Sequence, residues 1–303
     1  MVMAHVDRMS DAPAGGGGLA AIAGRTLGAV PPPALILAGI VTTQVGAAVA
    51  KQLFGLVGAS GAVALRLVFA ALVLLVVWRP SPRLNRRTLA VVAGYGAVLG
   101  GMNLVFYQAV ERIPLGAAVT IEFLGPLAVA VLGSRRWLDG LWALLAGGGV
   151  VLLAGGGGSG GLNWLGVVFA LLAGLGWAGY ILLSAALGSQ TSDGRGLALA
   201  MSFAGVLVAP VGVLDAGTAL LQPTVLVAGV AVALLSSVVP YSLELEALRR
   251  MPPRVFGVLM SLEPAVAALA GLLVLHERLG VLQWLAICCV VAASVGATRS
   301  ARR

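Results

Sequence analysis

The sequence has few charged residues, few aromatic residues and almost no histidine or cysteine. Charged residues make up 10% of the 303 positions, whereas a soluble domain carries roughly a quarter. Hydrophobic residues make up 60% of the chain and the mean hydropathy is +1.04. This balance excludes an ordinary soluble protein and predicts an all-α integral membrane protein.

The scarcity of metal-ligating and nucleophilic residues limits the chemistry of the chain. Cys288 and Cys289 are adjacent within one apolar run, which suits neither a disulfide framework nor separated metal ligands. His5 lies near the N-terminus and His276 at an expected helix end. We therefore expect no metal site, no cofactor and no catalytic residues.

The basic residues occur in short clusters between apolar runs. The formal net charge is +8 and the calculated pI is near 10.7, values that also occur in nucleic-acid-binding proteins. Clusters between spans are instead typical of the positive-inside rule of membrane topology. We expect a lipid bilayer as the partner of this surface, and no nucleic acid.

Ten apolar segments are long enough to cross the hydrocarbon core, which takes about 20 helical residues. They are residues 33–51, 61–79, 88–108, 115–133, 138–155, 164–184, 196–215, 223–243, 255–275 and 279–298. Residues 1–32, which contain Gly15–Gly18 and Pro31–Pro33, are predicted to form a disordered cytoplasmic tail. Residues 299–303 are predicted to form a short basic cytoplasmic tail.

Arginine in the loops indicates the orientation. If the N-terminus is inside, fifteen arginines fall in cytoplasmic segments. The opposite side then receives only Arg112 and Arg278, with Lys51 at a helix end. The rule that cytoplasmic loops are rich in Lys and Arg places both termini inside, with an even number of spans.

The segments 109–127 and 247–265 are two versions of one pattern, 138 positions apart. Ala109, Arg112, Pro114, Leu124 and Pro126 correspond to Ala247, Arg250, Pro252, Leu262 and Pro264. Copies offset by five spans must have opposite orientations in the membrane. The sequence therefore predicts two inverted five-helix repeats, 33–155 and 164–298, joined through the glycine run Gly155–Gly161, as in transporters with a site near the midplane.

Ionisable residues within spans are costly and mark functional sites by default. Glu122 and Glu263 lie roughly 10 Å and 12 Å into their spans at about 1.5 Å per residue. Arg66 is the third charge inside a span. Pro126 and Pro264 leave the carbonyls of residues 122 and 260 without an amide donor, so both helices should face the protein interior or a wet cavity.

Structural roles for these residues remain open alternatives. Glu122 could pair with Arg66 to lock two helices together, and Glu263 could pair with Lys51 or Arg66. Glu244 and Glu246 flank a basic turn, where solvation is the commoner role. Glu277 is expected to cap a helix end.

Polar and aromatic residues deep in the spans are further candidates for a binding site. Asn103 and Tyr107 share one face of the third span, Trp177 and Tyr180 share one face of the sixth, and Tyr241 lies in the eighth. Gly174, Gly176 and Gly179 leave room beside the sixth span for a ligand or a close helix. Packing or interhelical hydrogen bonding is the alternative role for each polar or aromatic residue.

At these residues the chain resembles the EamA-type drug/metabolite transporters, and within them the bacterial threonine/homoserine exporter group. The stretches that show this resemblance begin at Ala47 (AAVAKQLFGLVGASGAVALRL), Gly100 (GGMNLVFYQAVERIPLGAAVTIEFLGPLAVA), Gly176 (GWAGYILLS) and Val238 (VVPYSLELEALRRMPPRVFGVLMSLEPAVAALAGLLVLHE). The resemblance implies ten helices in two EamA repeats, an inner-membrane location and efflux of small amino acids. It also implies that Lys51, Arg66, Glu122, Glu244 and Glu263 match charged positions of the family.

These observations favour a secondary exporter of small amino acids that works by alternating access and takes up protons in return. In this hypothesis Glu122 binds the substrate ammonium and exchanges it for a proton, Arg66 or Lys51 holds the carboxylate, and Glu263 adjusts the local charge. A homodimer is a candidate assembly. The alternatives are an exporter of drugs or other metabolites and, from other classes, an intramembrane enzyme or a scaffold. The low aromatic content of 6% weighs against a drug pocket.

Overall fold

The computed structural model describes residues 30–80, 86–132, 137–155, 162–188 and 195–300, and their regular secondary structure is entirely helical. Most of the predicted N-terminal tail, residues 1–29, lies outside these described residues. The same holds for residues 156–161 of the glycine run and residues 301–303 of the predicted C-terminal tail.

Ten helical units follow one another along the chain. They are α2 (Pro32–Gln52), α3 (Phe54–Trp78), α4 (Arg86–Arg112), α5 (Leu115–Glu122) with α6 (Leu124–Leu132), α7 (Trp137–Gly155), α8 (Trp164–Gly188), α9 (Arg195–Ala216) with the short η2 (Gly217–Leu221), α10 (Pro223–Ala233) with η3 (Leu234–Val238) and α11 (Val239–Arg250), α12 (Pro253–Met260) with α13 (Glu263–Val274), and α14 (Val281–Ser300). The prediction of an all-helical membrane protein is confirmed.

Nine of these units, within the described ranges, contain a stretch long and apolar enough to cross a membrane. The tenth, α7, contains the shorter apolar stretch Gly140–Leu153. Helices suit this medium because all of their backbone bonds are made within the segment. Three of them begin with proline at a first position, Pro32, Pro223 and Pro253, where its missing N–H costs no helical bond.

Two predicted boundaries are wrong by about two turns. The second span was expected to begin at residue 61, but α3 begins at Phe54 and passes through Gly58, which has a φ of 65°. The eighth span was expected to end at residue 243, but its helix continues to Arg250. The apolar pattern thus missed one helical turn that precedes a kink at Gly58, and about two turns that follow residue 243.

The fourth and ninth helical units, which contain Pro126 and Pro264, are broken at equivalent positions. One break falls at Phe123, between α5 and α6, and the other at Ser261 and Leu262, between α12 and α13. Phe123 and Ser261 are 138 positions apart, as in the sequence pattern, and each precedes its proline by three residues. The breaks place Glu122 at the end of one short helix and Glu263 at the start of another.

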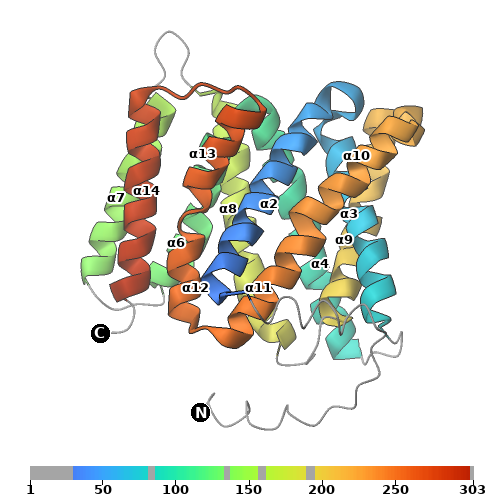
Figure 1. Cartoon of the computed structure of the whole chain (residues 1–303), viewed down its shortest axis with the longest axis horizontal. Coiled ribbons are helices and arrows are strands. Elements are labelled where there is room, and N and C mark those ends of the chain that lie inside the picture. The colour runs from blue at the N-terminus through green and yellow to red at the C-terminus, as the bar shows by residue number, and fades with distance from the viewer. Residues whose placement is uncertain (1–29, 81–85, 133–136, 156–161, 189–194, 301–303) are drawn as a thin grey trace.

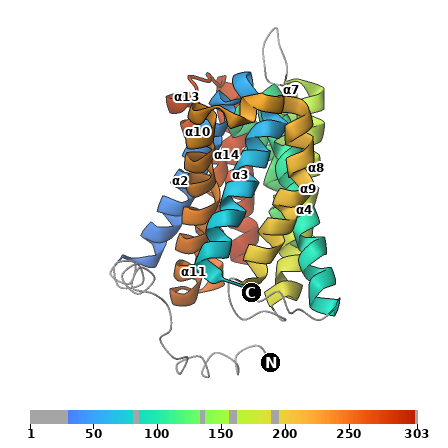
Figure 2. The same cartoon turned by 90° about the vertical axis from the view of Figure 1, so that its right-hand side faces the viewer.

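The units cross the bundle in alternating directions. The start of α2 and the end of α14 both lie at the lower end of Figure 1. The 90° view in Figure 2 shows the same up-and-down arrangement. Contacts between helices recur in the two halves. The packing of α4 on α8 is matched by that of α11 on α2, and the packing of α4 on α9 is matched by that of α10 on α3. The corresponding units α3 and α9, α5 and α13, and α7 and α14 pack on each other, as helices next to a two-fold axis would.

The break at Phe123 packs backbone to backbone against α8. A Cβ added at Gly125 would overlap the carbonyl oxygen of Gly174, and one added at Gly174 would lie 2.8 Å from the carbonyl oxygen of Glu122. Gly176 packs on Met102 of α4. Small residues allow this approach between membrane helices, so Gly174 and Gly176 serve close helix packing rather than ligand space.

We expect Gly125→Ala to lower the free energy of unfolding by about 1–3 kcal/mol or more, because the methyl group has no room. Gly101→Ala is the matched control, since nothing lies within 4 Å of its Cβ position. Alanine there should be neutral or stabilising. Thermal unfolding of the purified proteins in detergent measures both, and equal midpoints would contradict this packing.

Candidate functional site

A cavity of about 530 Å³ lies between the two halves of the bundle. Its deep wall comes from the middles of α2, α3 and α4, and its outer wall from Ala130, Leu248, Phe256 and Thr298. These four residues belong to helix segments at the lower end of Figure 1, where α2 begins and α14 ends. The cavity therefore extends from mid-bundle toward that end.

Seven of the nine candidate residues from the sequence line this cavity. They are Arg66, Asn103, Glu122, Trp177, Tyr180, Tyr241 and Glu263. They come from six of the ten helical units, α3, α4, α5, α8, α11 and α13, so only the tertiary fold brings them together. Tyr107 and Lys51 are not in the cavity wall.

Arg66 is held rigidly by neutral partners. Its Nε donates to Ser237 Oγ at 3.1 Å, its Nη1 to the Tyr107 hydroxyl at 3.4 Å, and its Nη2 to the Ser236 carbonyl at 2.9 Å. The guanidinium carbon also lies 5.7 Å from the centre of the Tyr107 ring, within range of a cation–π contact. Tyr107 thus supports Arg66 from outside the cavity.

The carbonyl of Ser236 is available because of the local backbone. In a regular α-helix it would accept a hydrogen bond from the amide of residue 240, but residue 240 is proline and has no N–H. The helix widens into a π turn at Leu234–Val238, a deviation that often occurs at functional sites. Arg66 supplies the missing donor. The guanidinium of Arg66 is therefore oriented by the unpaired carbonyl of the facing helix.

The carboxylate of Glu122 has no side-chain or backbone hydrogen bond among the described residues. Its side chain is only 7% exposed and lines the cavity. The direct ion pair with Arg66 that a purely structural role requires is not formed among the described residues; three of the five N–H donors of Arg66 bind Ser237, Tyr107 and Ser236 instead. A cation that enters the cavity could bind this carboxylate without first breaking a hydrogen bond or ion pair of Glu122.

Glu263 is the second buried carboxyl group in the wall. Its Oε1 accepts a hydrogen bond from Gln44 Nε2 of α2 at 3.1 Å. Neither of the partners considered from the sequence, Lys51 and Arg66, is bonded to it. Gln44 was not anticipated, although Thr42, Thr43 and Gln44 form a polar run in the middle of an otherwise apolar span.

Glu244 is a cavity residue that the sequence interpretation discounted. It was assigned to a solvated turn, but α11 continues to Arg250 and Glu244 lies in the cavity wall. Its position was foreseeable from Tyr241 and Pro240, which are three and four residues earlier and share its helix face. Glu246, two residues on, pairs instead with Arg250 at 3.8 Å.

Aromatic side chains form much of the rest of the wall. Phe106, Phe123, Trp177, Tyr180, Tyr241 and Phe256 all line it. Phe123 and Trp177 meet edge to face with 5.4 Å between ring centres. Although the chain has few aromatic residues, the fold concentrates them here, so the low overall content does not describe the cavity.

Asn103 contributes an amide to the cavity wall. Its Nδ2 donates to the Leu99 carbonyl of its own helix at 2.8 Å. This bond fixes the orientation of the side chain. In the described ranges no group of three or more histidine, cysteine, aspartate or glutamate side chains could hold a metal ion.

Lys51 lies at the opposite end of the bundle, in a tie between α2, α5 and the segment before α14. Its Nζ bonds Glu277 Oε1 at 2.7 Å and the Ile113 carbonyl at 3.0 Å. The other oxygen of Glu277 accepts the Leu115 amide at 2.8 Å. Glu277 thus caps the first turn of α5, the kind of role expected for it.

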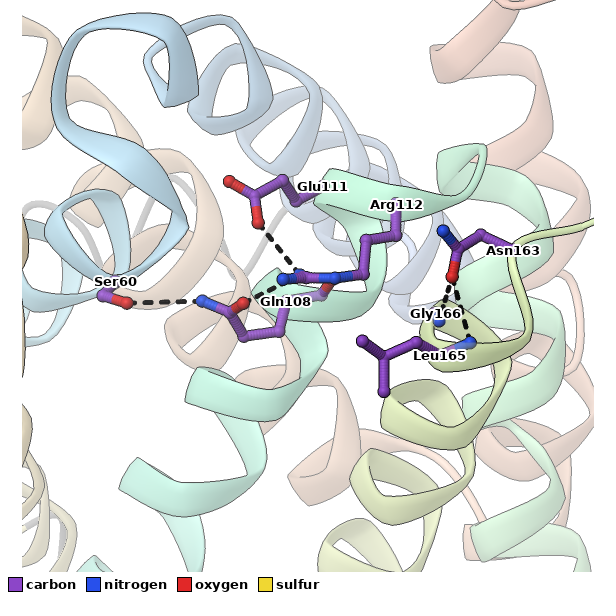
Figure 3. A network of polar contacts seen from close by, with 7 residues as sticks. All are labelled: Ser60, Gln108, Glu111, Arg112, Asn163, Leu165 and Gly166. Carbon is purple, nitrogen blue, oxygen red and sulfur yellow. Dashed lines mark hydrogen bonds and ion pairs between the residues drawn. The ribbon is translucent and has the colours of Figure 1, made fainter.

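A second polar network at the upper end joins α3 and α4 (Figure 3). Arg112 Nη1 donates to Gln108 Oε1 at 2.7 Å and to Glu111 Oε2 at 2.9 Å, and Gln108 Nε2 donates to Ser60 Oγ at 3.3 Å. Asn163 caps the first turn of α8 beside it. These two polar networks therefore tie helices together at the end away from the cavity.

Comparisons with known proteins agree with this architecture. The EamA-like transporter family matches residues 164–299. The threonine/homoserine exporters RhtA of Escherichia coli (strain K12) and Salmonella typhimurium are each 42% identical over 275 residues, covering 90% of this chain and 92% of theirs. A solved crystal structure 20% identical to this chain aligns over 89% of it and 98% of the other chain with a TM-score of 0.62, which shows a shared fold.

The resemblance deduced from the sequence is therefore confirmed. The chain is a multi-pass membrane protein homologous to a bacterial amino-acid exporter over nine-tenths of its length. The matching family and the named relatives are transporters. The chain belongs to the EamA-like transporter family.

Proposed function

We propose that this protein exports threonine, homoserine or similar small amino acids from the bacterial cytoplasm by alternating access, in exchange for protons. The observation that carries the proposal is one cavity containing both an oriented guanidinium, Arg66, and an unpaired carboxylate, Glu122. An amino acid carries the two opposite charges at one end. The relatives named as threonine/homoserine exporters support the choice of cargo.

In this proposal Arg66 binds the substrate carboxylate through its planar, multi-donor group, while Glu122 binds the ammonium. Both protein charges are buried, so each attraction acts in a medium of low dielectric constant. A cavity of about 530 Å³ has the size of a small-molecule site. Asn103 and the hydroxyls of Tyr180 and Tyr241 offer further polar contacts.

The cytoplasmic side is assigned in this proposal to the lower end of Figure 1. The support is the arginine distribution and the positive-inside rule. The cavity then extends toward the cytoplasm, while the Lys51–Glu277 tie lies on the outer side. This arrangement is the loading state of an exporter built from two inverted repeats, 33–155 and 164–298, with both termini inside.

A lipophilic substrate is the second candidate because of the aromatic wall. Six aromatic side chains around the acidic groups Glu122, Glu244 and Glu263 also suit a drug-like organic cation. Arg66 distinguishes the two: an amino acid has a carboxylate for it, whereas a simple lipophilic cation leaves it without an anion.

The primary test is efflux from cells preloaded with labelled threonine or homoserine. Cells producing the protein should lose label faster than cells without it, and collapsing the proton gradient should remove the difference. Unlabelled lipophilic cations should compete poorly. Equal loss with the protein present in the membrane would contradict amino-acid export, and strong competition by the cations would favour the second candidate.

Glu122→Gln should weaken the apparent affinity for the amino acid by roughly 30-fold or more, because losing one partner of a buried charge pair costs about 2–5 kcal/mol. Concentration-dependent transport in reconstituted vesicles measures this. Glu111→Gln is the matched control: Glu111 is exposed, pairs with Arg112 and lies outside the cavity wall. Wild-type affinity in Glu122→Gln would end the assignment.

The proposed orientation predicts which exposed positions an impermeant thiol reagent reaches. In a background with Cys288 and Cys289 replaced by serine, Gln222→Cys at the upper end should react in intact cells. Arg79→Cys at the lower end should react only after permeabilisation. Both positions are exposed and lie next to helix ends. The reverse labelling pattern would show that the proposed membrane orientation is wrong.

A further inference from the structure

The contact between α2 and α13 contains an acid and an amide that are almost completely buried. Gln44 is 3% exposed and Glu263 is 7% exposed, and both line the cavity. Gln44 Nε2 donates to Glu263 Oε1 at 3.1 Å. Glu263 is the first residue of α13, directly after the break at Ser261 and Leu262.

Both remaining oxygens of this pair are buried and have no hydrogen-bond partner. They are Gln44 Oε1 and Glu263 Oε2. Buried polar atoms are nearly always bonded. An amide oxygen and an ionised carboxylate are both acceptors only, so neither can satisfy the other, and both are closed to solvent.

A proton on Glu263 resolves this arrangement, because a carboxylic acid has one O–H donor. The same conclusion follows if the oxygen and nitrogen of the Gln44 amide are exchanged, an assignment made from hydrogen bonding alone. An amide oxygen would then face Glu263 Oε1 at 3.1 Å, and two acceptors at that distance also require a proton between them.

Among the side chains that the structure describes, no cation of the neighbouring helices takes the place of that proton. Lys51 of α2 bonds Glu277 and the Ile113 carbonyl. Arg66 of α3 donates to Ser236, Ser237 and Tyr107 and makes no bond to Glu263. The other titratable groups in the cavity wall are acidic or phenolic: Glu122 on α5, Tyr180 on α8, and Tyr241 and Glu244 on α11, while α14 contributes only Ser294 and Thr298.

We propose that Glu263 carries the proton that is exchanged for substrate, and that Gln44 is the positioning residue that holds its protonated form. This inference rests on the proposed proton-coupled export. It assigns the proton to Glu263 and leaves Glu122 for the substrate ammonium, so the two ligands occupy different carboxyl groups of one cavity.

The pair also connects proton binding to the conformation. When Glu263 gives up its proton, a charged carboxylate is left buried with only the Gln44 amide as donor, and Glu263 Oε2 and Gln44 Oε1 have no donor. That contact then favours separation of α2 from α13 or rotation of the carboxylate into the cavity. The break at Ser261 and Leu262 lies beside it, and a broken helix can move as two segments. The step forms and breaks only the O–H bond of Glu263.

Glu263→Gln tests the proposal because two glutamine amides can bond reciprocally, as a permanently protonated Glu263 would. In vesicles, a pH jump should accelerate transport of labelled threonine by the wild-type protein. For the variant, the rates with and without the pH jump should become equal. Counterflow of labelled threonine at equal pH on both sides measures substrate binding and exchange without a proton gradient. If the wild-type protein shows no counterflow, the proposed amino-acid transport is refuted, and the proton site is not what failed.

The exchanged pair Gln44→Glu with Glu263→Gln restores one carboxyl group opposite one amide. It should recover part of the response to the pH jump, a result that a merely structural contact does not predict. A full response in Glu263→Gln would overturn the proposal. If Glu263→Gln does not reach the membrane, Gln44→Met removes the amide and leaves the acid. It should shift the pH profile of driven transport, and an unchanged profile would equally overturn the proposal.

Discussion

The site depends on one backbone group, the carbonyl of Ser236, which has no α-helical donor because residue 240 is proline. In a membrane such a carbonyl persists only where protein or cavity water satisfies it. Arg66 does so at 2.9 Å, and in the same contact acquires a fixed orientation without an acidic partner. Its charge is therefore left for an anion that enters the cavity.

The prolines of the fourth and ninth helical units act on the same principle but with different outcomes. Both break their helices at equivalent positions, 138 residues apart. Glu122 ends the helix before one break and remains unpaired, whereas Glu263 begins the helix after the other break and bonds Gln44. The two halves share a backbone plan, yet their acids lie in different surroundings and can bind different ligands.

Composition and spacing were sufficient for the ten-helix membrane fold, both helix breaks and most of the cavity acids. They were less informative where a helix continued through a polar stretch, as at Glu244. They also missed Gln44, because an isolated glutamine in a span has many structural roles. Lys51 resembled a cavity charge in sequence, but α2 carries it past mid-bundle to Glu277 at the far end.

The sequence by itself determined that the chain lies in a membrane, that it is helical, and that Pro126 and Pro264 disturb two of its helices. These properties follow from transfer of each segment into lipid and from the missing amide of proline, which are local effects. Only the tertiary structure decided which charges meet, because the partners are supplied by other helices: Ser236 for Arg66, Gln44 for Glu263 and Glu277 for Lys51. In an apolar medium those partners decide which charge is neutralised within the protein and which stays available to a substrate.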